Sequence, residues 1–245
     1  PMSGLTERTC NDFRDYLLST NSRRSNGKKL SQNTAHSYFN KFKAALKQAY
    51  KDGLIQIDLN ARVPIIKQEE TQREFLTTEE MKTLIGTECD YPLLKQAAIF
   101  SALTGLRHSD LIKLTWSEIQ LDGTGQNCIR FRQKKTSGIE TLPVSEYALS
   151  FLGERGEPSE QVFQGLTYSA YNNAILKKWI AKAGITKDIT FHCFRHTYAI
   201  LQLAGGTDIY TVSKLLGHRE LKTTQVYARV LDEAKREAAE KLRFD

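Results

Sequence analysis

The sequence predicts a mainly α-helical protein with one small β-hairpin, divided into two domains. Apolar residues recur at helical spacing through most of the 245-residue chain, and a strand-like alternation appears near its middle. Between residues 62 and 74 a proline and a run of charged residues interrupt the pattern, which is typical of a linker. We therefore expect a small helical domain at residues 1–68 and a larger α+β domain at residues 69–245.

Two helices are expected in the first domain. Residues 6–18 form the first, and a polar loop follows it. The second begins at Ser31 and ends at Asp52-Gly53, and a row of lysines lies opposite its apolar stripe. That stripe consists of Ala35, Phe39, Phe42, Leu46 and Ala49.

The second domain opens with a helix cap at residues 77–80, where a threonine can accept backbone N–H groups and two glutamates suit the positive helix end. Residues 91–103 are predicted to form a buried helix that Gly105 ends, so that Arg107 begins the next helix, which continues over residues 109–114. Further helices are expected at 145–152, 169–183, 194–203, 209–216 and 222–230, and an amphipathic tail at 231–242.

The predicted hairpin lies between these helices. Residues 128–132 alternate apolar and cationic side chains, residues 136–138 turn, and residues 139–142 return before Pro143. The hairpin interrupts a domain that is otherwise helical.

Charge and cysteine content limit the class of protein. The formal net charge is +7, and residues 1–70 hold 12 Lys/Arg against 7 Asp/Glu, a local excess of +5 that suits a phosphate backbone as partner. No segment has the ~20 apolar residues of a membrane span, and the start of the chain, Pro1-Met2-Ser3-Gly4, is unlike a natural one, which suggests that more protein preceded it. Four scattered cysteines indicate free thiols in a reducing cytosol and no zinc site: Cys10, Cys89, Cys128 and Cys193.

Several separated residues have the chemistry needed to break and rejoin a phosphodiester without a metal ion. In chain order they are Arg107, His192-Cys193-Phe194-Arg195, Gly217-His218 and Tyr227. A phenol can attack phosphorus, but its pKa of about 10 leaves it mostly protonated at neutral pH, so it needs a base or a cationic setting. Arg107 and Arg195 can provide that setting because guanidinium groups bind phosphate oxygens bidentately and stabilise developing charge.

With these residues in this order, the sequence resembles the tyrosine recombinase, or phage integrase, family, which includes integrases of prophages and conjugative transposons. The resemblance covers residues 75–230 by motif and the first 70 more loosely. It implies an all-α SAM-like core-binding domain followed by a tyrosine recombinase catalytic domain. It also implies that Tyr227 becomes joined to a DNA 3′-phosphate and releases a 5′-hydroxyl that later attacks in reverse, so no ATP, metal ion or other cofactor is expected.

The resemblance further implies a general acid on the hairpin. The family has a lysine there that protonates the departing 5′-oxygen, since an alkoxide is costly to expel. Lys135 precedes Pro143 by eight residues, and this spacing selects it over its neighbour Lys134, which stays the alternative.

Three histidines receive different expectations. His192 lies three residues before Arg195 on the same helix face, and its imidazole can take or share the proton of Tyr227. His218 follows a glycine turn, and the resemblance makes it a hydrogen-bond donor to the scissile phosphate. His196 lies about 100° around the helix from Arg195, so we expect a structural role for it.

Partners are expected to be nucleic acid and further copies of the chain. The resemblance implies double-stranded DNA with specific core sites, a monomer in solution that forms a homo-tetramer on DNA, accessory host or directionality factors, no membrane, and a place in the bacterial cytosol. The tail docks on a neighbouring subunit or packs on its own domain. Phosphate contacts that position the duplex are expected from Lys41, Lys43, Lys47, Arg130 and Arg132.

Three functions stay open from sequence. The first is a site-specific recombinase that integrates or excises a mobile element, which the small helical domain and the tail favour. A type IB topoisomerase would use similar chemistry but rejoin the same strand. A DNA-binding regulator without catalysis is the third, and the presence of all six catalytic candidates argues against it. Each candidate also has an ordinary alternative, such as Arg107 paired with Asp110 on the surface or Tyr227 as a half-buried packing residue.

Overall fold

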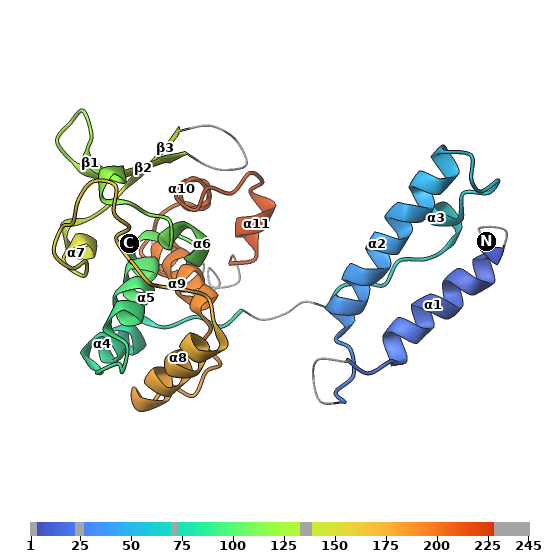
Figure 1. Cartoon of the computed structure of the whole chain (residues 1–245), viewed down its shortest axis with the longest axis horizontal. Helices are drawn as coiled ribbons and strands as arrows, with labels where there is room; N and C mark the ends of the chain where they lie inside the picture. Colours follow the sequence, from blue (N-terminus) through green and yellow to red (C-terminus); the bar gives the residue numbers. More distant parts are fainter. Residues whose placement is uncertain (1–3, 23–26, 70–72, 133–138, 228–245) are drawn as a thin grey trace, which may run out of the picture. The chain divides into compact units, whose positions relative to one another are not determined.

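The structure is a computed structural model that describes residues 4–22, 27–69, 73–132 and 139–227. The chain forms two compact units, Pro1–Gln72 and Arg73–Asp245 (Figure 1). This division falls four residues after the boundary expected at residue 68. Within the described ranges no helix has the length and apolar character needed to cross a membrane.

The first unit packs two long helices on one core. The helices α1 (Glu7–Ser19) and α2 (Gln32–Lys51) agree with the sequence prediction, and Thr6 and Ser31 cap their first turns. A short helix that was not expected, α3 (Leu59–Arg62), joins them. Apolar side chains of all three helices are buried together, among them Cys10, Leu17, Phe39, Leu46 and Leu59.

The predicted linker is wrong over its first half. Val63 and Ile66 are buried in the first core on either side of Pro64. The side chain of Asn33 on α2 bonds to both backbone groups of Glu69, at 3.0 Å each. The proline and the charged residues interrupt helical periodicity. Residues 63–69, which we call the strap of the first unit, nevertheless have a fixed path, because their apolar side chains join the core and their backbone groups bond to side chains of α2.

The second unit is built around α9 (Phe191–Ala204). Ten of its residues are buried, and α5 (Pro92–Thr104) packs along it. Pro92 occupies the first turn of α5, where its missing N–H has no helical partner to lose. The remaining helices are α4 (Thr78–Gly86), α6 (His108–Leu111), α7 (Glu146–Leu149), α8 (Ala170–Lys182), α10 (Ile209–Leu215) and α11 (Lys222–Gln225), with a 3₁₀ turn at Trp116–Glu118.

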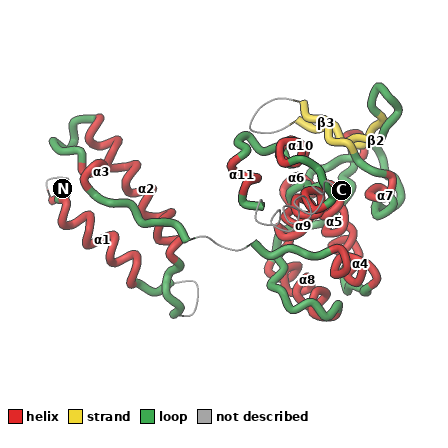
Figure 2. The backbone as a smooth tube through the Cα atoms, turned by 180° about the vertical axis from the view of Figure 1, so that it is seen from behind, coloured by secondary structure: helices red, strands yellow, loops and turns green. Residues whose placement is uncertain are grey.

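A small antiparallel sheet lies at the end of this unit opposite α4 and α8 (Figures 1 and 2). Its strands are β1 (Ile119–Leu121), β2 (Asn127–Arg132) and β3 (Ile139–Pro143), in the order β1-β2-β3. The pairing of β2 with β3 confirms the predicted hairpin, with Ile129 opposite Leu142. Strand β1 was not predicted, since three residues are too few to show an alternating pattern.

Other differences concern helix ends. Helix α9 begins at Phe191, three residues before the predicted start, because Thr190 and Cys193 form a capping pair across its first turn. The helix predicted from residue 109 is the shorter α6, and the predicted 222–230 helix ends at Gln225. The hairpin turn at 136–138 and the tail at 231–242 lie outside the described residues.

Candidate active site

The turn after α5 presents Arg107. Gly105 ends α5 with a φ of +71°, a left-handed conformation that glycine adopts without strain, and Ser101 Oγ donates to the Leu106 carbonyl at 2.8 Å. Arg107 is then the N-cap of α6. Its Nη1 lies 3.7 Å from the Asp110 carboxylate, and its side chain is 41% exposed, so the guanidinium is open to a ligand despite that contact.

Arg195 reaches the same turn from α9 and is almost fully buried. Its Nη1 donates to the Gly105 carbonyl, and its Nη2 donates to the Leu216 carbonyl at 2.5 Å. Burial, and next the nearby charge of Arg107, lower the pKa of Arg195 to about 10, which leaves it positively charged at neutral pH. One guanidinium thus joins the ends of α5 and α10 and keeps a fixed orientation.

The two arginines share a cavity of about 130 Å³. It lies between the turn after α5, the end of α10 and strand β3. Two guanidinium groups at one small cavity suit a phosphate group. Backbone groups of both turns contribute to the polar lining of the cavity. Its polar side chains are Arg107, Asp110, Thr141, Arg195 and Lys214. Thr141 and Lys214 were not predicted from the sequence.

His218 is tied to Arg195. Its Nε2 lies 3.1 Å from Arg195 Nη2, and its Nδ1 lies 2.8 Å from Thr224 Oγ1. A guanidinium can only donate, so Nε2 is the unprotonated nitrogen and Nδ1–H faces the buried threonine hydroxyl. Burial and the charges of Arg195 and Arg107 lower the pKa of His218 to about 4, in keeping with a neutral ring. The expected donation to phosphate therefore requires that this contact rearrange.

His192 is exposed beside these groups. Desolvation of its ring, followed by the charges of Arg195, Arg73 and Arg107, holds its pKa below the ordinary range. Its ring centroid is 4.4 Å from that of His196, in an edge-to-face arrangement. A neutral imidazole at this place is able to accept a proton.

Tyr227 is buried, with 3% of its surface exposed, and its hydroxyl lies 2.6 Å from His196 Nδ1. Burial, then the charges of His192 and Arg73, lower the pKa of His196 to about 3, so the ring is neutral and accepts the phenol proton as a hydrogen bond. Burial also raises the pKa of Tyr227. The structure therefore describes a protonated tyrosine held by a histidine.

This contact corrects the expectation for His196. The 100° step around α9 does turn it away from Arg195, but α11 lies on that side and brings Tyr227 to it. Helical geometry alone gave the direction of the side chain, whereas the partner comes from residues 31 positions later. Thr224 was missed for the same reason, since its contact with His218 depends on how the chain folds back after α10.

The remaining predicted residues lie elsewhere or are not described. Lys134 and Lys135 fall outside the described residues. Arg130 is exposed on β2, and Arg132 pairs with Ile139 through its backbone. On α2, Lys41 and Lys47 are exposed, whereas the ammonium of Lys43 donates to the Val63 carbonyl and holds the strap of the first unit.

Within the described residues, no group of three or more His, Cys, Asp or Glu side chains is arranged to hold a metal ion. The four cysteines are buried, free thiols.

Replacing Gly105 by alanine should destabilise the protein more than the same change at Gly184 or Gly123. The new Cβ would lie 2.6 Å from Tyr198 Cδ1 at a φ of +71°, so strain and overpacking together should lower the free energy of unfolding by about 2–4 kcal/mol. Urea denaturation measures this. Gly184→Ala, with a φ of +74° and open space, isolates the backbone strain, and Gly123→Ala, with neither, is the control. Equal stability of all three variants would contradict the packing described for this turn.

Comparison with protein families gives two matches. The model of the phage integrase family matches residues 74–234, and the model of the phage integrase SAM-like domain matches residues 1–63.

Curated relatives agree with these matches. The chain is 30% identical over 177 residues to a tyrosine recombinase of Thermosipho africanus and 31% identical over 183 residues to the tyrosine recombinase XerA of Thermococcus kodakarensis, with 69% of this chain and 62% of each relative covered. The tyrosine recombinase XerD of Listeria innocua is 28% identical over 202 residues, 73% of this chain and 65% of the relative. The chain thus spans less than two thirds of the length of these relatives.

Solved structures share the fold. The XerH site-specific recombinase bound to a palindromic difH substrate superposes with a TM-score of 0.72 at 17% identity, covering 97% of this chain and 72% of that one. A lambda integrase (75–356) dimer bound to a COC′ core site gives 0.68 at 21% identity, covering 93% and 81%. These likenesses confirm the predicted fold class, a SAM-like helical domain followed by a mainly α catalytic domain with a small sheet.

Proposed function

Because the chain belongs to the phage integrase family of tyrosine recombinases, we propose that it is a site-specific DNA recombinase that integrates or excises a mobile element. The observation that carries the proposal is the arrangement around Arg195. This residue lines the cationic cavity with Arg107, bonds to His218, and lies one position before His196, which holds the hydroxyl of Tyr227. Helix α9 thus contributes a side chain to the candidate phosphate-binding cavity and, one position later, a side chain that contacts the candidate nucleophile.

The reaction follows from the roles of these groups. Tyr227 Oη attacks the scissile phosphorus, a bond from phosphorus to Oη forms, and the bond to the 5′-oxygen breaks. Arg107 and Arg195 bind the non-bridging oxygens and stabilise the charge that accumulates on them. The 5′-oxygen leaves with a proton from a general acid, and a 5′-hydroxyl from the partner strand later reverses the step. The bond energy stays in the phosphotyrosyl link, so the scheme needs no ATP, and the two guanidinium groups stabilise the charge that a metal ion would otherwise stabilise.

The contacts of Tyr227 in the structure keep its phenol away from a phosphate bound in the cavity. Its phenol is protonated, buried and bonded to His196. The charges of Arg73, Arg195 and Arg107 oppose the rise of its pKa that burial causes. DNA binding would bring the phosphate into the cavity and draw the phenol out of this contact, with exposed His192 able to take its proton.

The partner of this site is double-stranded DNA with specific core sequences. Lys41 and Lys47 of the first unit and Arg130 of the second are exposed and able to bind phosphates. We expect a monomer in solution, a homo-tetramer on DNA, and a place in the bacterial cytosol, with host or directionality factors taking part. Two solved structures with a similar fold are bound to DNA, which supports DNA as the partner.

Recombination is tested with two duplexes that carry candidate attachment sequences, incubated with the full chain in a chelator and without ATP. The expected result is recombinant joints on a gel. A supercoiled plasmid in parallel separates the alternatives: relaxation without joints would favour a type IB topoisomerase, and binding without either product would favour a regulator.

Lys135→Ala should slow cleavage of an ordinary phosphodiester about 100-fold, as expected for loss of a general acid. The described residues Thr141 and Leu142 of the same hairpin line the cavity, which supports a general acid at this place. A 5′-phosphorothiolate substrate should restore the rate, because its sulfur leaves without protonation. Lys134→Ala is the matched control. A slow Lys135→Ala variant that the phosphorothiolate substrate does not rescue would contradict the general-acid role of Lys135. Rescue of Lys134→Ala alone would assign that role to Lys134.

A further inference from the structure

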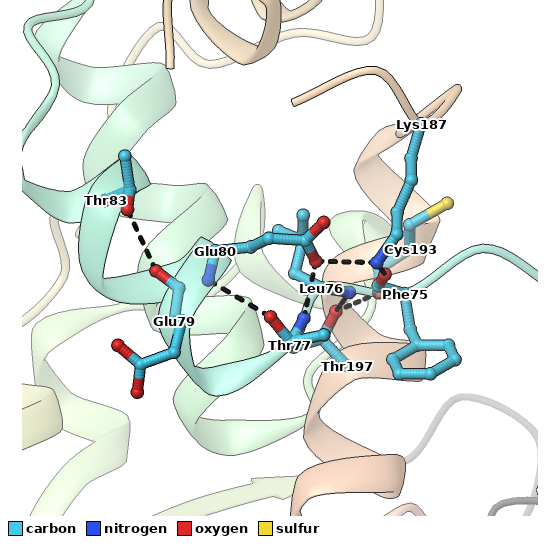
Figure 3. Close-up of polar contacts among 9 residues, drawn as sticks. All are labelled: Phe75, Leu76, Thr77, Glu79, Glu80, Thr83, Lys187, Cys193 and Thr197. Atoms are coloured by element: carbon cyan, nitrogen blue, oxygen red, sulfur yellow. Dashed lines mark hydrogen bonds and ion pairs between the residues drawn. The ribbon is translucent and has the colours of Figure 1, made fainter. Parts of the chain in front are cut away.

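Residues 73–77, at the start of the second unit, are hydrogen-bonded to α9 (Figure 3). The backbone N–H of Leu76 donates to Thr197 Oγ1 at 2.9 Å, and that hydroxyl donates to the Cys193 carbonyl at 2.9 Å. Leu76 and Thr197 are fully buried. The segment therefore has a fixed position relative to the helix that carries Arg195 and His196.

Lys187 adds a second attachment. Its Nζ donates to the Phe75 carbonyl at 3.0 Å and to the Glu80 carboxylate at 2.6 Å, as the dashed lines in Figure 3 show. The same ammonium lies 5.2 Å from the centroid of the Phe75 ring. We refer to Lys187, Glu80 and the Phe75 carbonyl as the Lys187 clamp. Its charges are only partly exposed, so it fixes the path of the chain just after Arg73.

Arg73 lies against the nucleophile. Its Cζ is 5.9 Å from the centroid of the Tyr227 ring, within the range of a cation–π contact. Two residues later, Phe75 packs against the cluster of apolar side chains that contains Tyr227. The segment thus places a guanidinium against the tyrosine ring and packs a phenyl ring on the apolar cluster to which the tyrosine belongs.

The charge of Arg73 also acts on the rest of the site. It lowers the pKa of Tyr227, against the rise that burial causes, and contributes to lowering the pKa of His192, His196 and His218. A cation so placed favours a phenolate over a phenol.

We infer that Arg73 is a further positioning residue of the active site, carried by the segment that joins the two units, which orients Tyr227 and stabilises negative charge on it. The inference rests on the proposed function. The orientation and the charge of Tyr227 then depend on residues 73–77, which follow the first unit in sequence. The Lys187 clamp is the device that keeps Arg73 at the tyrosine.

The charged and titratable groups that act on Tyr227, directly or through His196, lie on four segments of the chain. Arg73 lies on the joining segment, and Arg107 on the turn after α5. Helix α9 contributes His192, Arg195 and His196, and His218 follows α10. All remain in the variants below except Arg73, so a change in the titration of Tyr227 reports on that arginine.

The test compares Arg73→Gln and Arg73→Lys in the full chain, with Lys82→Gln as control because it removes a cation from an exposed pair on α4. Covalent adduct formation on nicked duplexes is followed against pH. Below its pKa, the phenolate fraction of Tyr227 falls when that pKa rises, so Arg73→Gln should be about two- to tenfold slower at neutral pH and approach the wild-type rate at higher pH. Arg73→Lys should lie between, and Lys82→Gln should match wild type.

A second readout does not need cleavage. NMR titration of the Tyr227 ring, assigned with Tyr227→Phe, should show a higher midpoint in Arg73→Gln than in wild type. Lys187→Met, which breaks the clamp and keeps Arg73, should shift the midpoint in the same direction, and the two changes together should shift it no further than Arg73→Gln alone. An unchanged midpoint would overturn the inference even if cleavage slowed. A shifted midpoint in a protein that forms no adduct on any duplex would instead contradict the proposed function and leave this contact standing.

Discussion

Replacing Tyr227 by phenylalanine should abolish the covalent protein–DNA adduct while DNA binding stays within about twofold of wild type. The substitution removes the hydroxyl that is proposed to attack phosphorus and keeps the buried ring, and loss of a nucleophile commonly leaves binding intact. Adduct formation on nicked duplexes and gel-shift titration measure the two effects. The fold should persist, because the lost hydrogen bond to His196 is worth only about 1 kcal/mol.

Tyr198→Phe is the matched control for this prediction. Tyr198 is a buried tyrosine of α9, and burial raises its pKa to about 12. The control loses the same atom from the same core cluster and should keep adduct formation. Adduct formation that persists in Tyr227→Phe would remove Tyr227 from the role of nucleophile.

Replacing Arg195 by alanine should slow cleavage at least about 100-fold, since a preorganised cation is removed from the developing charge. It should also lower the free energy of unfolding by about 3 kcal/mol, because the buried carbonyls of Gly105 and Leu216 lose their donor. Arg195→Lys keeps the charge without the planar fork, so it should recover part of the stability and little of the activity. Single-turnover cleavage and urea denaturation separate the two quantities.

Arg155 offers a control of the same chemical kind. Its Nη2 donates to the carbonyls of Trp116 and Ile119, at 3.0 and 3.1 Å, away from the cavity. Arg155→Ala should therefore lower stability and leave the cleavage rate unchanged below the unfolding temperature. Equal loss of cleavage in both alanine variants would mean that Arg195 acts only through stability.

The order of the motifs carried the resemblance to the family, and the resemblance implied the fold class. Helical periodicity and glycine turns, which are local properties, predicted most of the helices. Gly105 and the helix start at Arg107 follow from φ preference and capping, which a few adjacent residues determine. The family resemblance then linked Arg107, Arg195, His218 and Tyr227, which the structure brings to one site.

Contacts between distant segments could not be predicted in this way. The bond between His196 and Tyr227, and that between His218 and Thr224, depend on the path of α11 after α10. Arg73 lies in a stretch that looks like linker, and only its attachment through Leu76 and the Lys187 clamp brings it to the tyrosine. The strap of the first unit was predicted to be linker because of its proline and its charged run. Val63 and Ile66 are nevertheless buried, and their burial depends on a tertiary core that the local sequence does not show.

Trapping the covalent intermediate shows whether Tyr227 attacks DNA without a metal ion or ATP. The full chain is incubated with nicked duplexes that carry candidate attachment sequences, in a chelator, and any DNA-linked species is isolated on a denaturing gel and mapped by peptide analysis. We expect one adduct, a 3′-phosphate joined to the peptide that contains Tyr227. An adduct at another residue, or DNA binding with no adduct on any duplex, would contradict it.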